Sequence, residues 1–224
     1  MKQEELKRMA AEAAAREVNS GEIVGLGTGS TTYYAIKYLG ERTKDEGLGI
    51  IGIPTSRATE KIARESGIPL GTFEEYQEID IAIDGADQVD HRLNLIKGGG
   101  GAHVREKIVA STAKRFLVVV DETKVSKELN IPVPVEVLPY ATGLVIKRLE
   151  AMGATSLLRL SKKDYFISDN GNYVLDADFG TIEEPKKLEQ DINRIKGVVD
   201  NGIFAGYRPE VYVGTKSGVE VFHF

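Results

Sequence analysis

Short apolar strands alternate with amphipathic helices from residue 22 to residue 120, and this alternation restricts the fold more than any other feature. Residues 22–27, 49–53, 79–83 and 116–120 have the composition of buried strands, and apolar residues at helical spacing separate each strand from the next. Strands joined through helices pair in parallel, because the helix returns the chain to the same end of the sheet. We therefore expect an α/β fold with an open, mostly parallel sheet and helices on both faces.

The chain changes character near residue 131, where Pro132, Pro134 and Pro139 surround an alternating run of valines. We expect a domain boundary here. Beyond it the pattern predicts a helix over 141–152, a strand over 156–160, a hairpin of 165–167 with 172–175, and a helix through Leu188, Ile192, Ile195 and Val199.

The last two predicted strands, 210–214 and 219–222, flank a short turn and are expected to return to the first sheet. The predicted domains are therefore residues 1–130 together with 206–224, and a small α+β unit over residues 131–205.

Charge and composition narrow the partners of this chain. A net charge of -5 gives no reason to expect binding to nucleic acid, and 42% hydrophobic with 28% charged residues is typical of a soluble globular protein. The absence of cysteine excludes disulfides, thiolate metal sites and cysteine nucleophiles. No apolar stretch is long enough to cross a membrane, and Glu4, Glu5 and Glu12 make the first segment too acidic for a targeting peptide. We expect a cytoplasmic protein.

Thr28, Gly29, Ser30 and Thr31 form a glycine-containing loop between the first strand and its helix. Such a loop can present backbone N–H groups, hydroxyls and the positive end of a helix dipole to an anion, and its hydroxyls can cap the helix. A dinucleotide site is disfavoured, because Ser30 occupies the sixth motif position and the second strand ends in Pro54–Thr55 instead of an acidic residue. A tight turn with no ligand is the alternative.

Asp84 and Asp87 follow the third strand directly, where open α/β sheets bind their ligands. The small residues Gly85 and Ala86 separate them and leave room for a substrate. Paired carboxylates can act as acid and base or can hydrogen-bond hydroxyls, although a solvated Asp turn is the common alternative. No histidine or cysteine stands at ligand spacing, so we expect no metal.

A second glycine run follows Lys97, and residues Gly98–Gly101 can turn several N–H groups towards one anion. Glu106 lies near the start of the next helix. A charged residue there is usually exposed to solvent, but its position directly behind the glycines makes Glu106 a candidate catalytic residue. Lys124 follows the fourth strand and could bind phosphate or an oxyanion. His103 is a second-rank candidate.

Four blocks in this order, GTGST at 27–31, DGAD at 84–87, KGGGGAHVREK at 97–107 and DETK at 121–124, resemble the signature of the type A ribose-5-phosphate isomerase family. The resemblance covers essentially the whole chain. It implies a Rossmann-like domain, a smaller ferredoxin-like domain that serves as a lid or in oligomerisation, and a homodimer or homotetramer. Two residues depart from the pattern: Gly101 is often alanine in the family, and Gln88 is often glutamate.

The resemblance also implies an activity, the interconversion of ribose 5-phosphate and ribulose 5-phosphate through an enediolate in the non-oxidative pentose phosphate pathway, with no cofactor. Glu106 would be the general base that moves a proton between C2 and C1. Asp84 and Asp87 would assist ring opening and hold hydroxyls, while Lys97 and Lys124 would contact the phosphorylated pentose and stabilise charge. The pocket would be lined by Thr28, Gly29, Ser30, Thr31, Gly85, Ala86, Gly98, Gly99 and Gly100.

Two other classes of function stay open. A non-catalytic sugar-phosphate sensor would carry a DNA-binding helix pair, whereas one helix is predicted before the first strand, over residues 3–18. A phosphosugar deaminase, a lactonase or an acyl-CoA transferase on a similar fold is the second class, and the transferase would use a glutamate nucleophile.

Overall fold

The computed structural model describes residues 2–223, which form two compact units. The first unit contains the residues up to Ala86, Arg105–Lys124 and the residues from Tyr207 onwards. The second contains Asp87–Val104 and Val125–Gly206. The chain therefore passes between the units within the chemically rich segment 84–107. The domain division at residues 131 and 206 stays a prediction.

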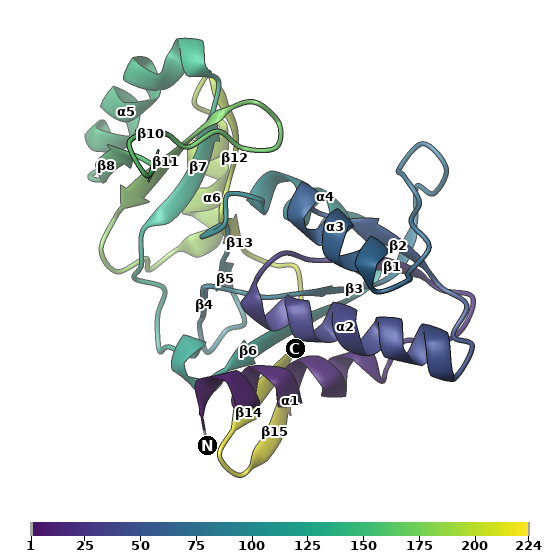
Figure 1. The fold of residues 1–224 in the computed structure, drawn as a ribbon. Coiled ribbons are helices and arrows are strands. Elements are labelled where there is room, and N and C mark those ends of the chain that lie inside the picture. The colour runs from purple at the N-terminus through teal and green to yellow at the C-terminus, as the bar shows by residue number, and fades with distance from the viewer. Residues whose placement is uncertain (1, 224) are drawn as a thin grey trace. The chain divides into compact units, whose positions relative to one another are not determined.

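A six-stranded sheet forms the centre of the first unit (Figure 1). Its strands are β1 (Ile23–Leu26), β2 (Ile51–Pro54), β3 (Ile79–Asp84), β6 (Ala113–Asp121), β14 (Glu210–Thr215) and β15 (Gly218–Phe222). They lie in the order β15-β14-β6-β3-β1-β2, and every neighbouring pair is parallel except β14 with β15. The predicted mostly parallel sheet and the return of the last strands to it are confirmed.

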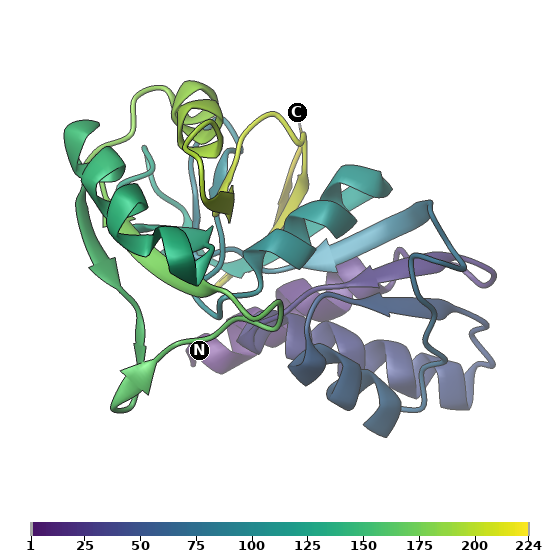
Figure 2. The ribbon, with the colours of Figure 1, turned by 90° about the horizontal axis from the view of Figure 1, so that it is seen from above.

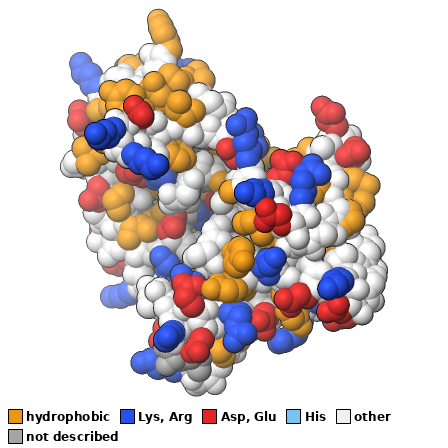
Figure 3. Space-filling view, viewed as in Figure 1, with side chains coloured by type: hydrophobic (Ala, Val, Ile, Leu, Met, Phe, Trp, Pro, Cys, Tyr) orange, Lys and Arg blue, Asp and Glu red, His pale blue; other side chains and the backbone are white. Residues whose placement is uncertain are grey.

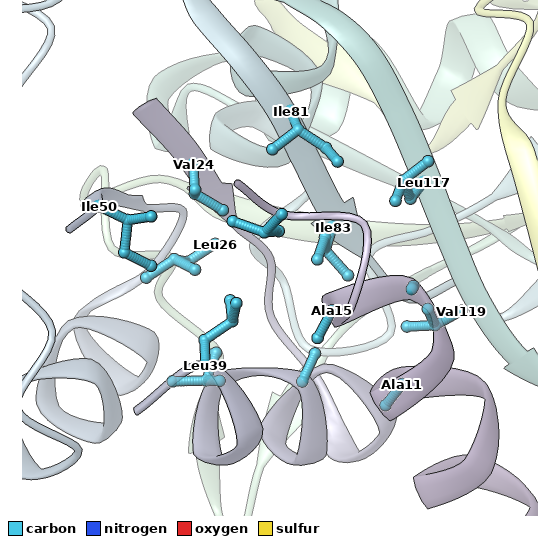
Figure 4. Close-up of a cluster of buried hydrophobic side chains, with 14 of the residues drawn as sticks. Ala11, Ala15, Val24, Leu26, Leu39, Ile50, Ile81, Ile83, Leu117 and Val119 are labelled. Atoms are coloured by element: carbon cyan, nitrogen blue, oxygen red, sulfur yellow. The ribbon is translucent and has the colours of Figure 1, made fainter. Parts of the chain in front are cut away.

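Helices cover both faces of this sheet (Figure 2). They are α1 (Gln3–Ala15), α2 (Ser30–Asp45), α3 (Arg57–Glu65) and α4 (His103–Thr112), and the short 3-10 helix η1 (Glu122–Lys124) follows β6. On one face, α1 and α2 pack against alternate strand residues in a single apolar cluster (Figure 4), which includes Val24, Leu26, Ile81, Ile83, Leu117 and Val119. On the other face, α4 approaches β1 closely, since a Cβ on Gly25 would lie 2.4 Å from Cγ1 of Val109.

The second unit is built on a four-stranded antiparallel sheet in the order β12-β7-β11-β8. Its elements follow the chain as β7 (Val133–Val137), η2 (Pro139–Ala141), α5 (Thr142–Ala151), β8 (Thr155–Leu158), β11 (Tyr173–Asp178), α6 (Pro185–Asn193) and β12 (Val198–Asn201). The sequence β-α-β-β-α-β in this strand order is the ferredoxin-like arrangement, as predicted. Val133, Val135 and Val137 alternate into its core because successive strand residues face opposite sides.

Two smaller sheets in the second unit carry no clear sequence signal. The hairpin of β9 (Leu160–Ser161) and β10 (Asp164–Tyr165) is one of them. The other joins β4 (Gln88–Val89), β5 (Leu95–Ile96) and β13 (Ile203–Phe204) in the order β13-β5-β4. Strands of two residues are too short for a detectable alternation of apolar and polar positions.

Two predicted elements of the second unit were wrong in extent. The helix predicted through Val199 ends at Asn193, and Val199 lies in β12, after a turn in which Gly197 takes a φ of +99°. The predicted hairpin around residues 169–171 exists only as an isolated bridge of Ile167 with Tyr173.

Among the described residues no helix is both long and apolar enough to span a bilayer.

Candidate functional site

The predicted site residues belong to both units. Those of the first unit are Thr28–Thr31, Asp84–Ala86, Glu106 and Lys124, and those of the second are Asp87, Lys97 and Gly98–Gly100. Each set is held by contacts within its own unit, and these contacts determine which groups can act on a ligand.

Asp84 is a buried carboxylate at the C-terminal end of β3, with 3% of its surface exposed. Its Oδ1 accepts hydrogen bonds from the N–H of Thr28 at 3.1 Å and from its neighbour Gly85 at 2.8 Å. Two N–H donors on one oxygen fix the orientation of the carboxylate. Asp84 thus joins the first glycine loop to the end of β3, as expected of a group at this edge of the sheet.

The hydroxyl of Thr28 faces the start of α3 in a cluster of four hydroxyls. Its Oγ1 lies 2.8 Å from Thr55 Oγ1, 2.8 Å from Ser56 Oγ and 3.0 Å from Thr59 Oγ1. Ser56 is also the N-cap of α3, and its hydroxyl accepts a hydrogen bond from the Thr59 N–H. The cluster holds the first loop against the connection between β2 and α3. The hydroxyl of Thr28 therefore stabilises the loop through these contacts.

The predicted hydroxyl cap of α2 is wrong. The N-cap residue is Gly29, with a φ of +141° and no side-chain hydrogen bond to the helix. This backbone conformation is open to glycine and strained for other residues, so the chain turns into α2 through Gly29 itself. Ser30 is exposed and Thr31 half-buried at the first turn of the helix, where their hydroxyls and N–H groups stand at the positive end of the helix dipole.

Glu106 lies in the first turn of α4 and has only 4% of its surface exposed. Its neighbour Lys107 is also buried, at 6% exposure. Charged residues on a helix are usually exposed to solvent, but Glu106 and Lys107 are both buried. A carboxylate out of contact with bulk water at a helix start is suited to taking up a proton from carbon, because few water molecules compete for it.

Lys124 ends the 3-10 turn that follows β6, and Asp121 shapes that turn. The carboxylate of Asp121 accepts hydrogen bonds from the N–H of Thr123 at 3.0 Å, from the Thr123 hydroxyl, and from the side chain of Gln3. Burial by itself raises the pKa of Asp121, but these hydrogen bonds and the positive charge of Lys124 outweigh burial and lower that pKa. The DETK block thus holds a lysine next to an ionised carboxylate.

In the second unit, Asp87 is linked to the second glycine run. Its Oδ2 accepts from the N–H of Gly99 at 2.7 Å, and its own N–H donates to the carbonyl of Ile96. The side chain of Asp87 is therefore oriented by a backbone group of the loop itself. The structure brings together Asp87 and Gly99, which lies twelve residues later in the sequence.

Lys97 is almost completely buried, at 2% exposure, and its Nζ lies 5.5 Å from the ring centroid of Phe204. Its backbone N–H donates to the carbonyl of Gly202 at 2.9 Å. A Cβ on Gly202 would lie 2.2 Å from the Lys97 carbonyl oxygen, so this approach requires glycine. A buried ammonium over an aromatic face is poorly hydrated and binds an anion more strongly than a surface lysine does.

Gly98 and Gly101 bound a tight turn, with φ values of +100° and +75° and a hydrogen bond from the Gly101 N–H to the Gly98 carbonyl. His103 is fully buried, and its ring leaves no room for a side chain on Gly98. His103 therefore shapes the loop. At the other end, a Cβ on Gly101 would lie 2.4 Å from the ring of Phe166, and the φ of +75° is strained for other residues, so the loop requires glycine here.

Gln88 forms two hydrogen bonds with Asn130. Its Oε1 accepts from the N–H of Asn130 at 2.8 Å, while its Nε2 donates to Asn130 Oδ1 at 2.7 Å. A carboxylate at this position could not donate the second of these hydrogen bonds.

Among residues 2–223 no group of three His, Asp or Glu side chains is arranged to hold a metal ion.

Comparison with known proteins covers nearly the full chain. The family model of ribose 5-phosphate isomerase A (phosphoriboisomerase A) matches residues 51–218. A ribose-5-phosphate isomerase A of Methanothermobacter thermautotrophicus is 50% identical over 219 residues, 96% of each chain, and one of Methanosarcina acetivorans is 52% identical over 214 residues, 95% of this chain and 91% of the relative.

Solved structures agree with the sequence relatives. The ribose 5-phosphate isomerase A of Methanocaldococcus jannaschii superposes with a TM-score of 0.95 at 45% identity, with all of both chains covered. A D-ribose-5-phosphate isomerase in complex with phospho-erythronic acid gives 0.97 at 43% identity, again over all of both chains. The match of the family model and the identity of these relatives show that this chain belongs to the ribose 5-phosphate isomerase A family.

Proposed function

We propose that this chain is an aldose-ketose isomerase that interconverts D-ribose 5-phosphate and D-ribulose 5-phosphate. Its membership of the family supports this activity, and so does the relative that binds phospho-erythronic acid, a phosphorylated sugar acid. The single structural observation that carries it is the buried carboxylate of Glu106 in the first turn of α4.

In the proposed mechanism, Glu106 acts as the general base on the open-chain sugar. Its carboxylate takes the proton from C2, the C2–H electrons form the C1=C2 bond, and the carbonyl oxygen at C1 gains the charge of an enediolate. The protonated Glu106 then returns the proton to C1, and the proton of the C2 hydroxyl passes to the charged oxygen on C1, so that C2 becomes the ketone and C1 carries a hydroxyl. One carboxylate serves both steps, so no redox reagent is needed.

The remaining site residues bind the sugar and stabilise charge. Asp84 and Asp87 assist ring opening and accept hydrogen bonds from sugar hydroxyls. Lys97 stabilises the enediolate oxygen, because a poorly hydrated ammonium interacts more strongly with developing charge than a solvated one. Lys124 contacts the substrate through its charge. Backbone groups of Thr28–Thr31, Gly85–Ala86 and Gly98–Gly100 line the pocket.

The activity is tested by incubating the protein with ribose 5-phosphate in deuterated water, without added metal or nucleotide. Ribulose 5-phosphate with solvent deuterium at C1 is the expected product, because the proton on Glu106 exchanges with solvent. An inert substrate would exclude the isomerase and favour a sugar-phosphate sensor. Release of ammonia from an amino sugar phosphate, or a CoA ester trapped on Glu106, would favour one of the other enzymes on similar folds.

We also propose that the protein is a homodimer or homotetramer in the cytoplasm, assembled through the second unit. Hydrophobic side chains gather over α5 and β8 in Figure 3. At the start of α5 and in the turn before it, Leu138, Tyr140 and Leu144 are exposed at 49%, 102% and 48%. A second copy of this chain is the occupant we expect, because apolar surface of this extent is usually covered in an assembly. In light scattering after gel filtration, Tyr140→Glu with Leu144→Glu should lower the mass, whereas Lys163→Glu should not. An unchanged mass in the double variant would contradict this interface.

A further inference from the structure

Arg159, between β8 and β9 of the second unit, contacts the backbone of the second glycine run. Its Nη1 donates to the carbonyl of Gly98 at 2.8 Å and to the carbonyl of Gly99 at 3.0 Å. Hydrogen bonds from a charged donor are stronger than those between neutral groups. One guanidinium nitrogen therefore holds two successive peptide groups of the loop.

The guanidinium is fixed from its other side. Nε of Arg159 donates to Oδ2 of Asp176 in β11 at 2.9 Å, and Nη2 donates to Oδ1 of the same carboxylate. The ring of Phe166 lies 5.7 Å from the guanidinium carbon, and the Arg159 side chain is only 14% exposed. A bidentate pair in a half-buried setting restricts the orientation of the arginine as well as its position.

These contacts set the direction of two backbone N–H groups. In a trans peptide the carbonyl and the following N–H point in opposite directions. The peptide joining Gly98 and Gly99 is held at both ends, by Arg159 at its carbonyl and by Asp87 at the Gly99 N–H, 2.7 Å away. In the next peptide Arg159 holds the carbonyl, and the N–H of Gly100 points away from the guanidinium. Within residues 2–223 this N–H has no hydrogen-bond partner, and Gly100 is exposed.

We propose that Arg159 is a positioning residue that presents the N–H of Gly100 to the substrate and, through the Gly99 N–H, holds the carboxylate of Asp87. The identity of the ligand in this inference rests on the proposed function. The orientation of the loop by Arg159 does not depend on that function. Without Arg159, the glycines would sample many backbone conformations, because glycine restricts φ and ψ less than any other residue. Ligand binding would then have to order the loop, at a cost in affinity.

The sequence allows a direct readout of this loop. Residues 98–101 contain all three Gly–Gly peptide bonds of the chain. Glycine labelled with ¹³C at the carbonyl and with ¹⁵N therefore gives, in an experiment selecting bonded ¹³C–¹⁵N pairs, amide signals from Gly99, Gly100 and Gly101 alone. Phospho-erythronic acid serves as the probe, and the Gly100 signal of the wild type should shift most on its addition.

The test compares Arg159→Met, Arg159→Lys and Asp176→Asn with Arg148→Met, which removes an exposed arginine of the same unit. Arg159→Met should weaken phospho-erythronic acid binding and raise KM about tenfold to a hundredfold, the range expected for lost charged hydrogen bonds, and should abolish the Gly100 shift. The pH profile of kcat should not move, because Glu106 is unchanged. Arg159→Lys should recover part of the affinity, since one ammonium can reach Asp176 or the carbonyls but not both.

A dissociation constant within twofold of wild type in Arg159→Met, with the Gly100 shift retained, would overturn the proposal. Should that variant not fold, Asp176→Asn keeps the guanidinium and releases it from β11, so unchanged binding and shift there would overturn it equally. A wild type that binds phospho-erythronic acid but does not convert ribose 5-phosphate would remove the proposed function and leave the role of Arg159 intact.

Discussion

The carboxylate of Asp84 occupies the space that a side chain on Gly27 would need: a Cβ there would lie 2.1 Å from Asp84 Oδ1. The first glycine loop and the end of β3 therefore fit together only when residue 27 is glycine. This contact connects the first motif of the chain with the DGAD block. Asp84 lies 57 residues after Gly27 in the sequence.

Gly27→Ala should displace Asp84 and lower kcat/KM strongly, because the added methyl cannot avoid the carboxylate without moving β1 or β3. Steady-state kinetics with ribose 5-phosphate give the measurement. Gly143→Ala is the matched control, since a Cβ there meets nothing within 4 Å. Equal kinetics of the two variants would show that the Asp84 position is unimportant.

Glu106→Gln should lower kcat by at least about a hundredfold to ten-thousandfold with a smaller change in KM, since the amide cannot accept the proton from carbon. The same change at Glu65, whose side chain is 61% exposed, should leave both constants unchanged. Near-normal turnover in Glu106→Gln would remove this residue from the mechanism.

Lys97→Ala should chiefly weaken the binding of a phosphorylated inhibitor, as the ammonium over Phe204 is lost. Lys97→Met retains much of the side-chain packing and should show the same loss, which separates charge from stability. Titration calorimetry with phospho-erythronic acid measures both, and the exposed Lys163→Ala gives the baseline. Unchanged affinity in Lys97→Met would contradict a role for the charge.

Thr28→Val should reduce the free energy of unfolding by about 1–3 kcal/mol, because it leaves the buried hydroxyls of Thr55 and Thr59 short of a partner. Thr28→Ser keeps the hydroxyl and should lose less. Urea denaturation of the three proteins tests this, and equal midpoints would mean that the hydroxyl cluster contributes no stability.

Asp121→Asn should destabilise the protein in a pH-dependent way. The pKa of Asp121 lies below its ordinary value of 3.8, so the ionised carboxylate stabilises the folded state above pH 3.8, and this contribution is lost as the pH falls further. The difference in unfolding free energy between wild type and variant should therefore be constant at neutral pH and shrink at acidic pH. Denaturation across a pH series measures it. A difference independent of pH, as expected for the exposed Asp45→Asn, would show that ionisation of Asp121 is not involved.

The sequence by itself determined the larger features of the fold. Apolar runs such as Ile79–Ile83, separated by helical spacing, predicted the parallel sheet, since a buried strand between helices has few other arrangements. The alternating Val133, Val135 and Val137, with the prolines around them, predicted only a domain boundary, and the structure shows that they form a strand with all five residues buried. The candidate residues Asp84, Asp87, Lys97 and Glu106 were also identified from local motifs, because their chemistry is concentrated in one segment.

The tertiary structure decided what those residues touch. Sequence spacing could not reveal that Gly29, through its backbone conformation, replaces a hydroxyl cap, or that the helix ends at Asn193, before Val199. Arg159 gave no signal at all, since a single arginine beside a short strand is common. Its contacts with Gly98 and Gly99 join residues about sixty positions apart in the chain. Local patterns encode which segments are buried, whereas long-range packing determines which polar groups meet.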